Sequence, residues 1–529
     1  MAFVNNERAN EEISSVRTTK QRGFWHNLRK YLREYTQLTG IHGLRYVTEK
    51  RSRTEKVVWA LLLILSLGGC IYMICKIMYK YENSPVVVSF ATEDTPLYQI
   101  PFPAITICPE AKYNKRVFDY RDIHFQIVRN EEVDETNFTK FSHLRLVCKD
   151  LNIISKTANK TVGHEFFETL EEVKFKANQT FIVCIYYKQS IECEDFFTPV
   201  IIDGGICYSF NILGRDEIFK DHVYNYAQYY HVPNKSADNF NIETGYNQNA
   251  GVNTYPRRAL MSGIDNALHI FFNFDTNYTD SICNGLYRGF RVLIHNPWDV
   301  PRLTKHFFRV PFSKVVVAAM EPEIIITSDT VRKFKPEKRK CFMQDERPLQ
   351  HFKFYSQRNC LLECQTNYTL KKCGCVEYFM PRNNKTAICG NGLSECVEQA
   401  ESELKVKELE YKLEGNHFCN CRPSCTNMKF SVETSHSDFY FEEYFETHLQ
   451  MKFAQDGSYW SILQVYFKEE QFKTMERNEL YGTSDLISNF GGLLGLFTGF
   501  SLISLLEIIY FCSLRIFCNE RTHGIWSGP

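Results

Sequence analysis

The chain has 529 residues, of which 44% are hydrophobic and 23% charged, so it is long enough to bury a large core. Basic and acidic residues number 62 each, and the resulting net charge of zero argues against nucleic acid as a main partner. The mean hydropathy of −0.32 excludes a polytopic membrane protein. Any membrane role must therefore rest on few spanning segments.

The N-terminal part contains the first such segment. Residues 1–56 are polar and basic, which does not fit a cleavable signal peptide. Val57–Cys75 then runs without a charged residue and is long enough to cross a hydrocarbon core of about 30 Å. The basic residues directly before it are Lys50, Arg51, Arg53 and Lys56. By the positive-inside rule, we expect a cytosolic N-terminus over 1–56 and a spanning helix over 57–76.

A second uncharged segment, Leu486–Leu506, lies near the C-terminus and contains polar residues. These are Ser488, Asn489, Thr498, Ser501 and Ser504, and Glu507 follows the segment directly. On one continuous helix, Asn489 and Glu507 are five turns apart and share a face, with Gly492 and Leu496 near the same line. Polar groups at membrane depth usually face protein or water, so this face is a candidate pore wall. The glycines of GGLLG and GLFTG fit close helix packing equally well, and both interpretations stay open.

Two spans predict a large extracellular segment over 77–485, a second span with the pore over 486–511 and a cytosolic C-terminus over 512–529. Of the 20 cysteines, 16 lie between Cys108 and Cys425, which predicts a disulfide framework in a non-cytosolic domain. The glycosylation sequons are at Asn137, Asn159, Asn178, Asn234, Asn277, Asn367 and Asn384. Cysteines and sequons thus fall in the same predicted segment and support this topology.

The extracellular segment has the patterns of a mixed α+β domain. Strands are predicted around residues 101–110, 181–187, 205–211 and 289–301, and residues 314–331 form two β-rich runs around Pro322. Residues 351–370 and 394–415 have helical periodicity, and the first helix would place Cys360 and Cys364 on one face. The fold class is therefore a membrane protein with two transmembrane helices and a large disulfide-rich extracellular domain.

The sequence contains no recognisable catalytic site. His164–Glu168 reads HEFFE, with a glutamate where a zinc-protease motif needs its second histidine. There is no nucleophile-elbow motif and no phosphate loop. We expect no enzyme activity, no metal site and no cofactor. Taken alone, the pair His42–Gly43 before the first span indicates only a turn.

Seven motifs in order, FPAITIC, GICYSFN, GFRVLIHNP, YSQRNCLLEC, CGCVEYFMP, CNCRPSC and GGLLGLFTGFS, resemble the degenerin/epithelial sodium channel family. They are most similar to its insect pickpocket branch, and with the His-Gly pair they extend from His42 to Glu507. The resemblance implies a trimer in which each subunit has two spans and an extracellular domain of palm, β-ball, finger, thumb and knuckle. It also implies a plasma-membrane location with both termini cytosolic.

The resemblance implies a disulfide pattern. The thumb pairs would be Cys341–Cys425, Cys360–Cys421, Cys364–Cys419, Cys373–Cys396 and Cys375–Cys389, and the earlier pairs Cys108–Cys207 and Cys184–Cys193. Parity leaves Cys148 to pair with Cys283.

The resemblance also implies the site residues. Gly499, Phe500 and Ser501 match the selectivity filter, a stretch that is extended in similar channels, so that backbone carbonyls from three subunits ring the ion path. His42 and Gly43 match a gating motif in a re-entrant segment. The pore and gate residues are Ser488, Asn489, Gly492, Leu496 and Glu507.

The implied function is a sodium-preferring, amiloride-sensitive cation channel of sensory or epithelial cells, gated by an extracellular stimulus or ligand. Its partners are the lipid bilayer and two further subunits, and the permeant ion is sodium. The alternatives are a non-conducting modulatory subunit of a heteromer, an ATP-gated trimeric receptor, and an adhesion or receptor ectodomain on two membrane anchors. The sequence does not select the stimulus.

Overall fold

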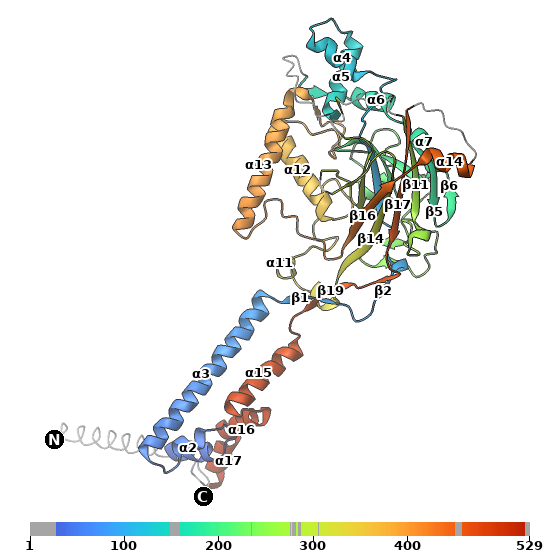
Figure 1. Ribbon diagram of the computed structural model, residues 1–529. Coiled ribbons are helices and arrows are strands. Elements are labelled where there is room, and N and C mark those ends of the chain that lie inside the picture. The colour runs from blue at the N-terminus through green and yellow to red at the C-terminus, as the bar shows by residue number, and fades with distance from the viewer. Residues whose placement is uncertain are drawn as a thin grey trace, which may run out of the picture. The chain divides into compact units, whose positions relative to one another are not determined.

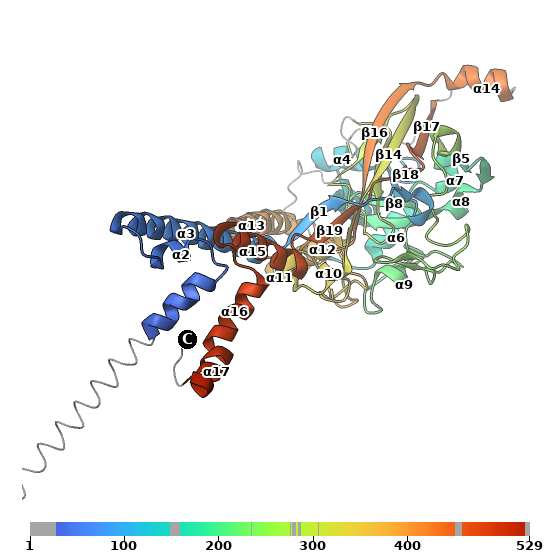
Figure 2. The ribbon, with the colours of Figure 1, turned by 90° about the horizontal axis from the view of Figure 1, so that it is seen from below.

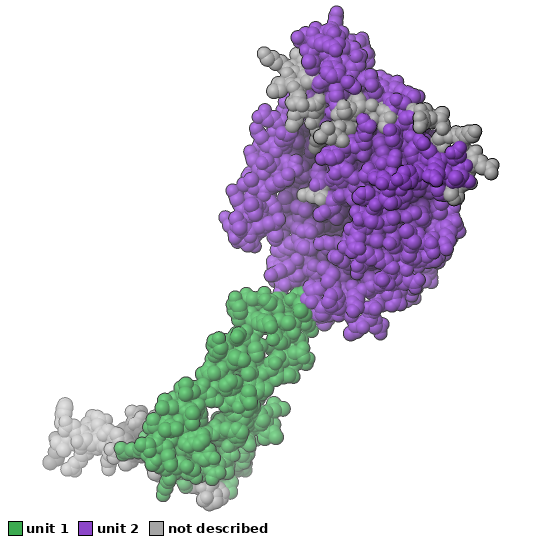
Figure 3. All heavy atoms as spheres, in the orientation of Figure 1, with its two compact units in different colours: residues 1–87, 479–529 green, residues 88–478 purple. Residues whose placement is uncertain are grey.

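The computed structural model describes residues 28–148, 159–233, 235–275, 277, 282–283, 287–304, 306–449 and 457–523. The chain divides into two compact units, shown in two colours in Figure 3. The helical unit combines Met1–Val87 with Glu479–Pro529, and the β-rich unit is Val88–Asn478. The units divide at residues 87–88 and 478–479, whereas the sequence-based limits of the extracellular segment are 77 and 485.

The helical unit contains the two ends of the chain. Its helices cover residues 28–38, α2 (Leu44–Thr48), α3 (Arg53–Asn83), α15 (Thr483–Thr498), α16 (Leu502–Cys512) and α17 (Leu514–His523). Helix α3 extends beyond both ends of the predicted span 57–76. Its start at Arg53 is fixed by the Ser52 side chain, which caps the helix by accepting a hydrogen bond from the Glu55 amide. Among the described residues, Arg53–Asn83 and Leu502–Asn519 are long and apolar enough to cross a membrane.

The second apolar segment is not the single helix that the sequence predicts over 486–511. Helix α15 ends at Thr498 because Gly499 adopts a left-handed conformation, with φ 68° and ψ 13°. The Ser501 hydroxyl then caps α16 by accepting a hydrogen bond from the Ser504 amide, and the ribbons show α15 and α16 as separate helices (Figures 1 and 2). The expected five-turn alignment of Asn489 with Glu507 is therefore wrong, because it requires an unbroken helix.

The β-rich unit is built on two sheets. The larger has eight strands in the order β1-β19-β14-β17-β11-β5-β6, with β16 also paired to β14 (Figure 1). Its strands are β1 (Val86–Phe90), β5 (Phe181–Tyr186), β6 (Gln189–Ile191), β11 (Leu268–Asp275), β14 (Lys314–Thr327), β16 (Asn427–Asp438), β17 (Ser458–Phe467) and β19 (Met475–Glu479). In β11 every second residue is buried, as expected for a strand with one face on the core.

Strand β14 corrects a prediction. The sequence indicates two runs separated by Pro322, whereas Lys314–Thr327 is one continuous strand. Along one edge it pairs with β17 only as far as Met320 and with β19 only from Ile325 onward. Pro322 lies in the gap between these neighbours, where the missing N–H of proline removes no ladder hydrogen bond on that edge.

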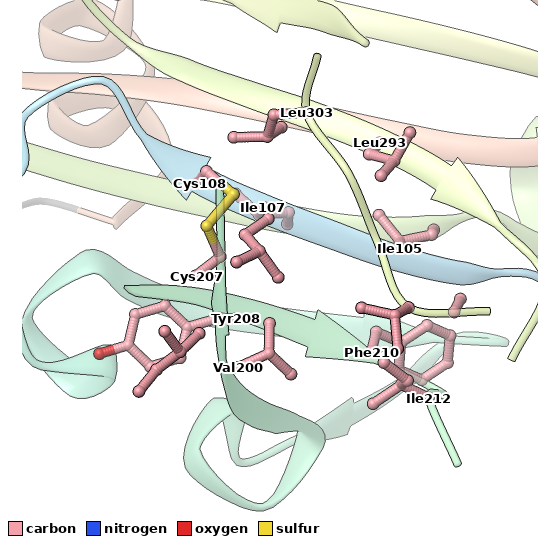
Figure 4. Close-up of a cluster of buried hydrophobic side chains, with 14 of the residues drawn as sticks. Ile105, Ile107, Cys108, Val200, Cys207, Tyr208, Phe210, Ile212, Leu293 and Leu303 are labelled. Carbon is pink, nitrogen blue, oxygen red and sulfur yellow. A yellow bond between two sulfur atoms is a disulfide. The ribbon is translucent and has the colours of Figure 1, made fainter. Parts of the chain in front are cut away.

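The smaller sheet has five strands in the order β13-β12-β3-β8-β7. They are β3 (Ala104–Pro109), β7 (Phe197–Ile202), β8 (Gly205–Phe210), β12 (Phe290–His295) and β13 (Phe308–Val310). The side chains of Ile105, Ile107, Val200 and Leu293 gather between these strands in the core, and the Cys108–Cys207 disulfide joins β3 to β8 (Figure 4). This core holds the motifs FPAITIC and GICYSFN next to each other.

The β-rich unit also contains short elements outside the two sheets. Three two-stranded ladders pair β2 (Thr95–Pro96) with β18 (Gln471–Phe472), β4 (Thr161–Val162) with β15 (Ile388–Cys389), and β9 (Phe240–Asn241) with β10 (Gly245–Tyr246). The shorter helices are α7 (Ala177–Thr180), α8 (Cys193–Phe196), α9 (Arg215–Ile218), α10 (Asp329–Arg332), α11 (Pro336–Arg339) and α14 (Phe441–Leu449).

Two long helices, α12 (Gln357–Cys373) and α13 (Ser394–Leu413), lie side by side at one flank of the β-rich unit (Figure 1). Helix α12 starts six residues after the predicted start at 351, because the Ser356 side chain accepts a hydrogen bond from the Asn359 amide and fixes the first turn. The structure forms the same eight disulfides that were expected, including Cys148–Cys283 and the five within 341–425.

A helical cluster of α4 (Tyr120–Val128), α5 (Glu135–Cys148) and α6 (Glu165–Val173) completes this unit. The sequon asparagines Asn159, Asn178, Asn277, Asn367 and Asn384 are exposed, and Asn137 is half-buried. Asn234 lies outside the described residues. The exposed positions are compatible with the proposed glycosylation.

Candidate functional site

The break between α15 and α16 consists of Gly499, Phe500 and Ser501, the triplet expected to form the selectivity filter. The last i to i−4 backbone hydrogen bond of α15 is the one that the Gly499 amide donates to the Gly495 carbonyl at 2.8 Å. The Ser501 side chain caps the N-terminus of α16. Three residues of non-helical backbone are thereby placed within an apolar segment. Backbone of this kind at membrane depth is tolerated only where protein buries it or water lines it.

The His-Gly pair lies against this break. Gly43 has φ 85°, a conformation that lets the chain turn from the N-terminal segment into α2. The His42 amide donates to the Thr498 carbonyl at 2.9 Å, which satisfies one of the open acceptors at the end of α15. A Cβ atom built on Gly499 would lie 2.6 Å from His42 Nδ1. The two motifs, 457 residues apart by their numbers 42 and 499, are therefore in direct contact.

Helix α3 contacts α15 within the last turn before the break. The Ser66 hydroxyl donates to the Phe497 carbonyl, and a Cβ atom on Gly69 would lie 3.1 Å from Phe497 Cε1. Tyr46 of the segment after His42 stacks on Trp59 of α3, with ring centroids 4.5 Å apart. The contacts of Ser66 and Gly69 with Phe497 hold the end of α15 against α3, and the Tyr46–Trp59 stack holds α2 against the same helix.

Glu507 lies on α16 and faces the N-terminal segment. Its Oε2 accepts a long hydrogen bond of 3.4 Å from the Gly40 amide. Further along, Arg515 forms an ion pair with Glu34, and the Phe511 ring packs edge-on against Tyr35 at 5.1 Å. The N-terminal segment thus runs beside α16 and α17.

The other predicted pore residues form an exposed face on α15. Ser488, Asn489, Gly492 and Leu496 are all exposed in the single chain, and Leu496 is 81% exposed. Leu494, Phe497 and Thr498 instead point toward the His-Gly segment and α3. The structure therefore keeps Asn489, Gly492 and Leu496 together, as predicted, and places Glu507 on a different helix.

The family described as Amiloride-sensitive sodium channel matches residues 35–511, which include the His-Gly pair, the broken helix and Glu507. The chain belongs to this family. Members are plasma-membrane ion channels with two transmembrane helices that assemble as multimers, so this chain is a channel protein and not an enzyme. No group of side chains able to hold a metal ion occurs among the residues that the structure describes.

Three relatives illustrate the range of the similarity. Pickpocket protein 28 of Drosophila melanogaster is 26% identical over 92% of this chain and 79% of its own length. Sodium channel protein Nach of the same fly is 23% identical over 95% of this chain and 91% of its own. The human bile acid-sensitive ion channel is 22% identical over 91% of this chain and 85% of its own.

Sequence reasoning missed several residues of this site. Gly40, Ser66 and Gly69 contact the second span through Glu507 and Phe497. The glycine pair at 68–69 within an otherwise bulky apolar helix was a usable signal, because small residues in a spanning helix often mark a close helix contact. No comparable signal pointed to Gly40.

Proposed function

We propose that this chain forms a sodium-preferring cation channel of three subunits, of the same or a related sequence, in the plasma membrane with both termini cytosolic. The observation that carries the proposal is the interruption of the second apolar segment at Gly499–Ser501, with His42 packed against it. An anchoring helix has no need of such a break.

Conduction then depends on the triplet and on Glu507. Three copies of Gly499–Ser501 around one axis supply backbone oxygens that replace part of the hydration shell of sodium. Glu507, next to Gly40, adds three carboxylates per trimer and raises the local cation concentration. Amiloride block is proposed from family membership alone.

Gating is assigned to the exposed face of α15. Ser488, Asn489, Gly492 and Leu496 are exposed in the single chain, so in a trimer this face meets either water or its copies. The left-handed joint at Gly499 is the point at which α15 can tilt relative to α16. An extracellular stimulus would act through such a tilt.

Whole-cell recording of Ser488→Val tests the proposal. A bulky apolar side chain on the α15 face should prevent closure and give a constitutive cation current whose reversal potential follows the sodium gradient. Ser437→Val is the control, because Ser437 is an exposed serine of β16 in the β-rich unit. A Ser488→Val protein that reaches the cell surface and carries no current, alone or with related subunits, contradicts the proposed channel.

A further inference from the structure

A groove lies between α12 and α13 at the flank of the β-rich unit, where Figure 1 shows the two helices side by side. Its volume is about 670 Å³, within the range of about 300–1,000 Å³ that is usual for sites holding small organic molecules. The disulfides Cys360–Cys421 and Cys364–Cys419 tie α12 to the segment that follows α13, and three of these four cysteines line the groove. The covalent links hold its walls in place.

The walls of the groove combine aromatic rings with polar groups. Phe418 and Tyr368 meet edge to face, with ring centroids 6.1 Å apart, and Phe418 is 37% exposed. The Tyr368 hydroxyl donates to Glu403 Oε2 at 3.1 Å and accepts from Lys407 Nζ at 3.0 Å. Such a wall suits a sugar, because a pyranose ring presents C–H groups on its faces and hydroxyl groups, which donate and accept, at its edge.

Asn367 also lines this groove, and it is the acceptor residue of an N-glycosylation sequon. It lies in the C-terminal half of α12 and is exposed. Thr369 of the same sequon is only 1% exposed, so a transferase cannot reach its hydroxyl once α12 has packed. The sugar must therefore be attached while this segment is still unfolded. When α12 then packs, one end of the glycan is already fixed at the wall of the groove.

We propose that this groove binds the first sugars of the glycan on Asn367. Attachment joins C1 of the first N-acetylglucosamine to Nδ2 of Asn367, as the bond from C1 to a lipid diphosphate donor breaks and Nδ2 loses a proton. Because the sugar is tethered at the wall, its effective concentration in the groove is high, and even weak contacts with Phe418, Glu403 and Lys407 hold it there. The inference rests on the extracellular placement of the β-rich unit in the proposed function.

Release of glycans from the folded full-length protein, purified from eukaryotic cells, tests this assignment. Asn384 is the internal control, because it is an exposed sequon asparagine in the loop between α12 and α13 and does not line the groove. Peptide N-glycosidase should release the glycan on Asn367 about tenfold more slowly than that on Asn384, since contacts in the groove shield it. After reduction and denaturation the two rates should be similar. Site-resolved mass spectrometry measures both.

Phe418→Ala opens the groove and should raise the release rate at Asn367 toward that at Asn384. Tyr411→Ala is the matched variant, because Tyr411 is 42% exposed and packs edge-on against Phe418 at 5.4 Å but does not line the groove. It should leave both rates unchanged. Phe418→Leu, which keeps an apolar side chain, serves if Phe418→Ala does not fold, and it should raise the rate by less.

Three results overturn the proposal. They are a vacant Asn367 in protein whose Asn384 carries a glycan, equal release rates at the two sites in the folded wild type, and equal rates at Asn367 in wild type and the folded Phe418 variants. Protein in which neither asparagine carries a glycan overturns the inference together with the extracellular placement of the unit. Failure of the groove and failure of the proposed topology therefore give different results.

Discussion

The imidazole of His42 packs directly on the backbone of Gly499, so closely that a Cβ atom at 499 would come within 2.6–2.8 Å of three ring atoms. Gly499 also holds φ 68°, a conformation that costs other residues about 1–2 kcal/mol. Contact and conformation therefore both require glycine at this position. The relationship joins the N-terminal segment to the break in the second span.

Gly499→Ala should abolish the current of the channel or alter its ion selectivity. The added methyl group must displace either His42 or the backbone of the triplet, since neither leaves room for it. Recording of current and reversal potential, with surface labelling to establish expression, measures the effect. Adding His42→Ala to the variant should restore part of the current, because it removes the atoms that the methyl group meets.

A control for that experiment isolates the backbone penalty. Gly415 has φ 80° at the end of α13, with no atom within 4 Å of a built Cβ. Gly415→Ala should lower stability slightly and leave the current unchanged. Equal currents in Gly499→Ala and wild type would show that the His42 contact does not constrain the triplet.

The glycine pair on α3 offers a matched comparison. A Cβ on Gly69 would lie 3.1 Å from the Phe497 ring, whereas one on Gly68 meets nothing within 4 Å. Gly69→Ala should push Phe497 and shift channel gating, and Gly68→Ala should not. Open probability from single-channel recording is the measurement. The same response from both variants would contradict the α3–α15 contact as the cause.

Glu507→Gln should reduce single-channel conductance, by about twofold at low ionic strength and by less in physiological salt, because screening weakens the effect of a fixed charge. Conductance measured over a range of sodium concentrations checks this. Glu410→Gln, at an exposed position of α13, is the control. An unchanged conductance at low salt removes the proposed role of Glu507.

The β-rich unit should lose stability on mild acidification because of His295. Its Nε2 lies 2.8 Å from the Thr106 hydroxyl and its Nδ1 lies 2.8 Å from the Asn296 carbonyl, and burial lowers the pKa of the ring to about 3. The unfolded chain, with an ordinary pKa of about 6.5, takes up the proton first. Stability is therefore complete above about pH 6.5 and falls below it, by up to about 1.4 kcal/mol per pH unit.

Thermal unfolding of the purified protein between pH 7 and about pH 5 measures this dependence. Burial lowers the pKa of His143, His269 and His351 in the same direction, so His295→Asn should reduce the slope without removing it. Burial raises the pKa of Asp299, and this acts in the opposite sense because the folded chain then takes up that proton before the unfolded chain does. His436→Asn on exposed β16 is the control, and an unchanged slope in His295→Asn would refute the assignment.

Local sequence was sufficient for several features of this protein. The apolar run Val57–Cys75 predicted the first span, because an uncharged run of that length is typical of a membrane-spanning helix. Cys360 and Cys364 lie on one face of α12, as their spacing of four residues indicates. The strands at 101–110 and 205–211 were also found, since alternation and bounding prolines are local signals. Family resemblance supplied the motif residues and all but one of the disulfide pairs.

Tertiary structure decided the rest. The composition of the uncharged run Leu486–Leu506 favours one continuous span, and only the family resemblance implied an extended stretch at Gly499–Ser501; in the structure, Gly499 in a left-handed turn and the Ser501 cap divide the run into two helices. The contacts of His42 with Gly499 and of Gly69 with Phe497 join residues that no local pattern relates. Periodicity reports which face of a single element is apolar, whereas these contacts depend on where separate elements meet.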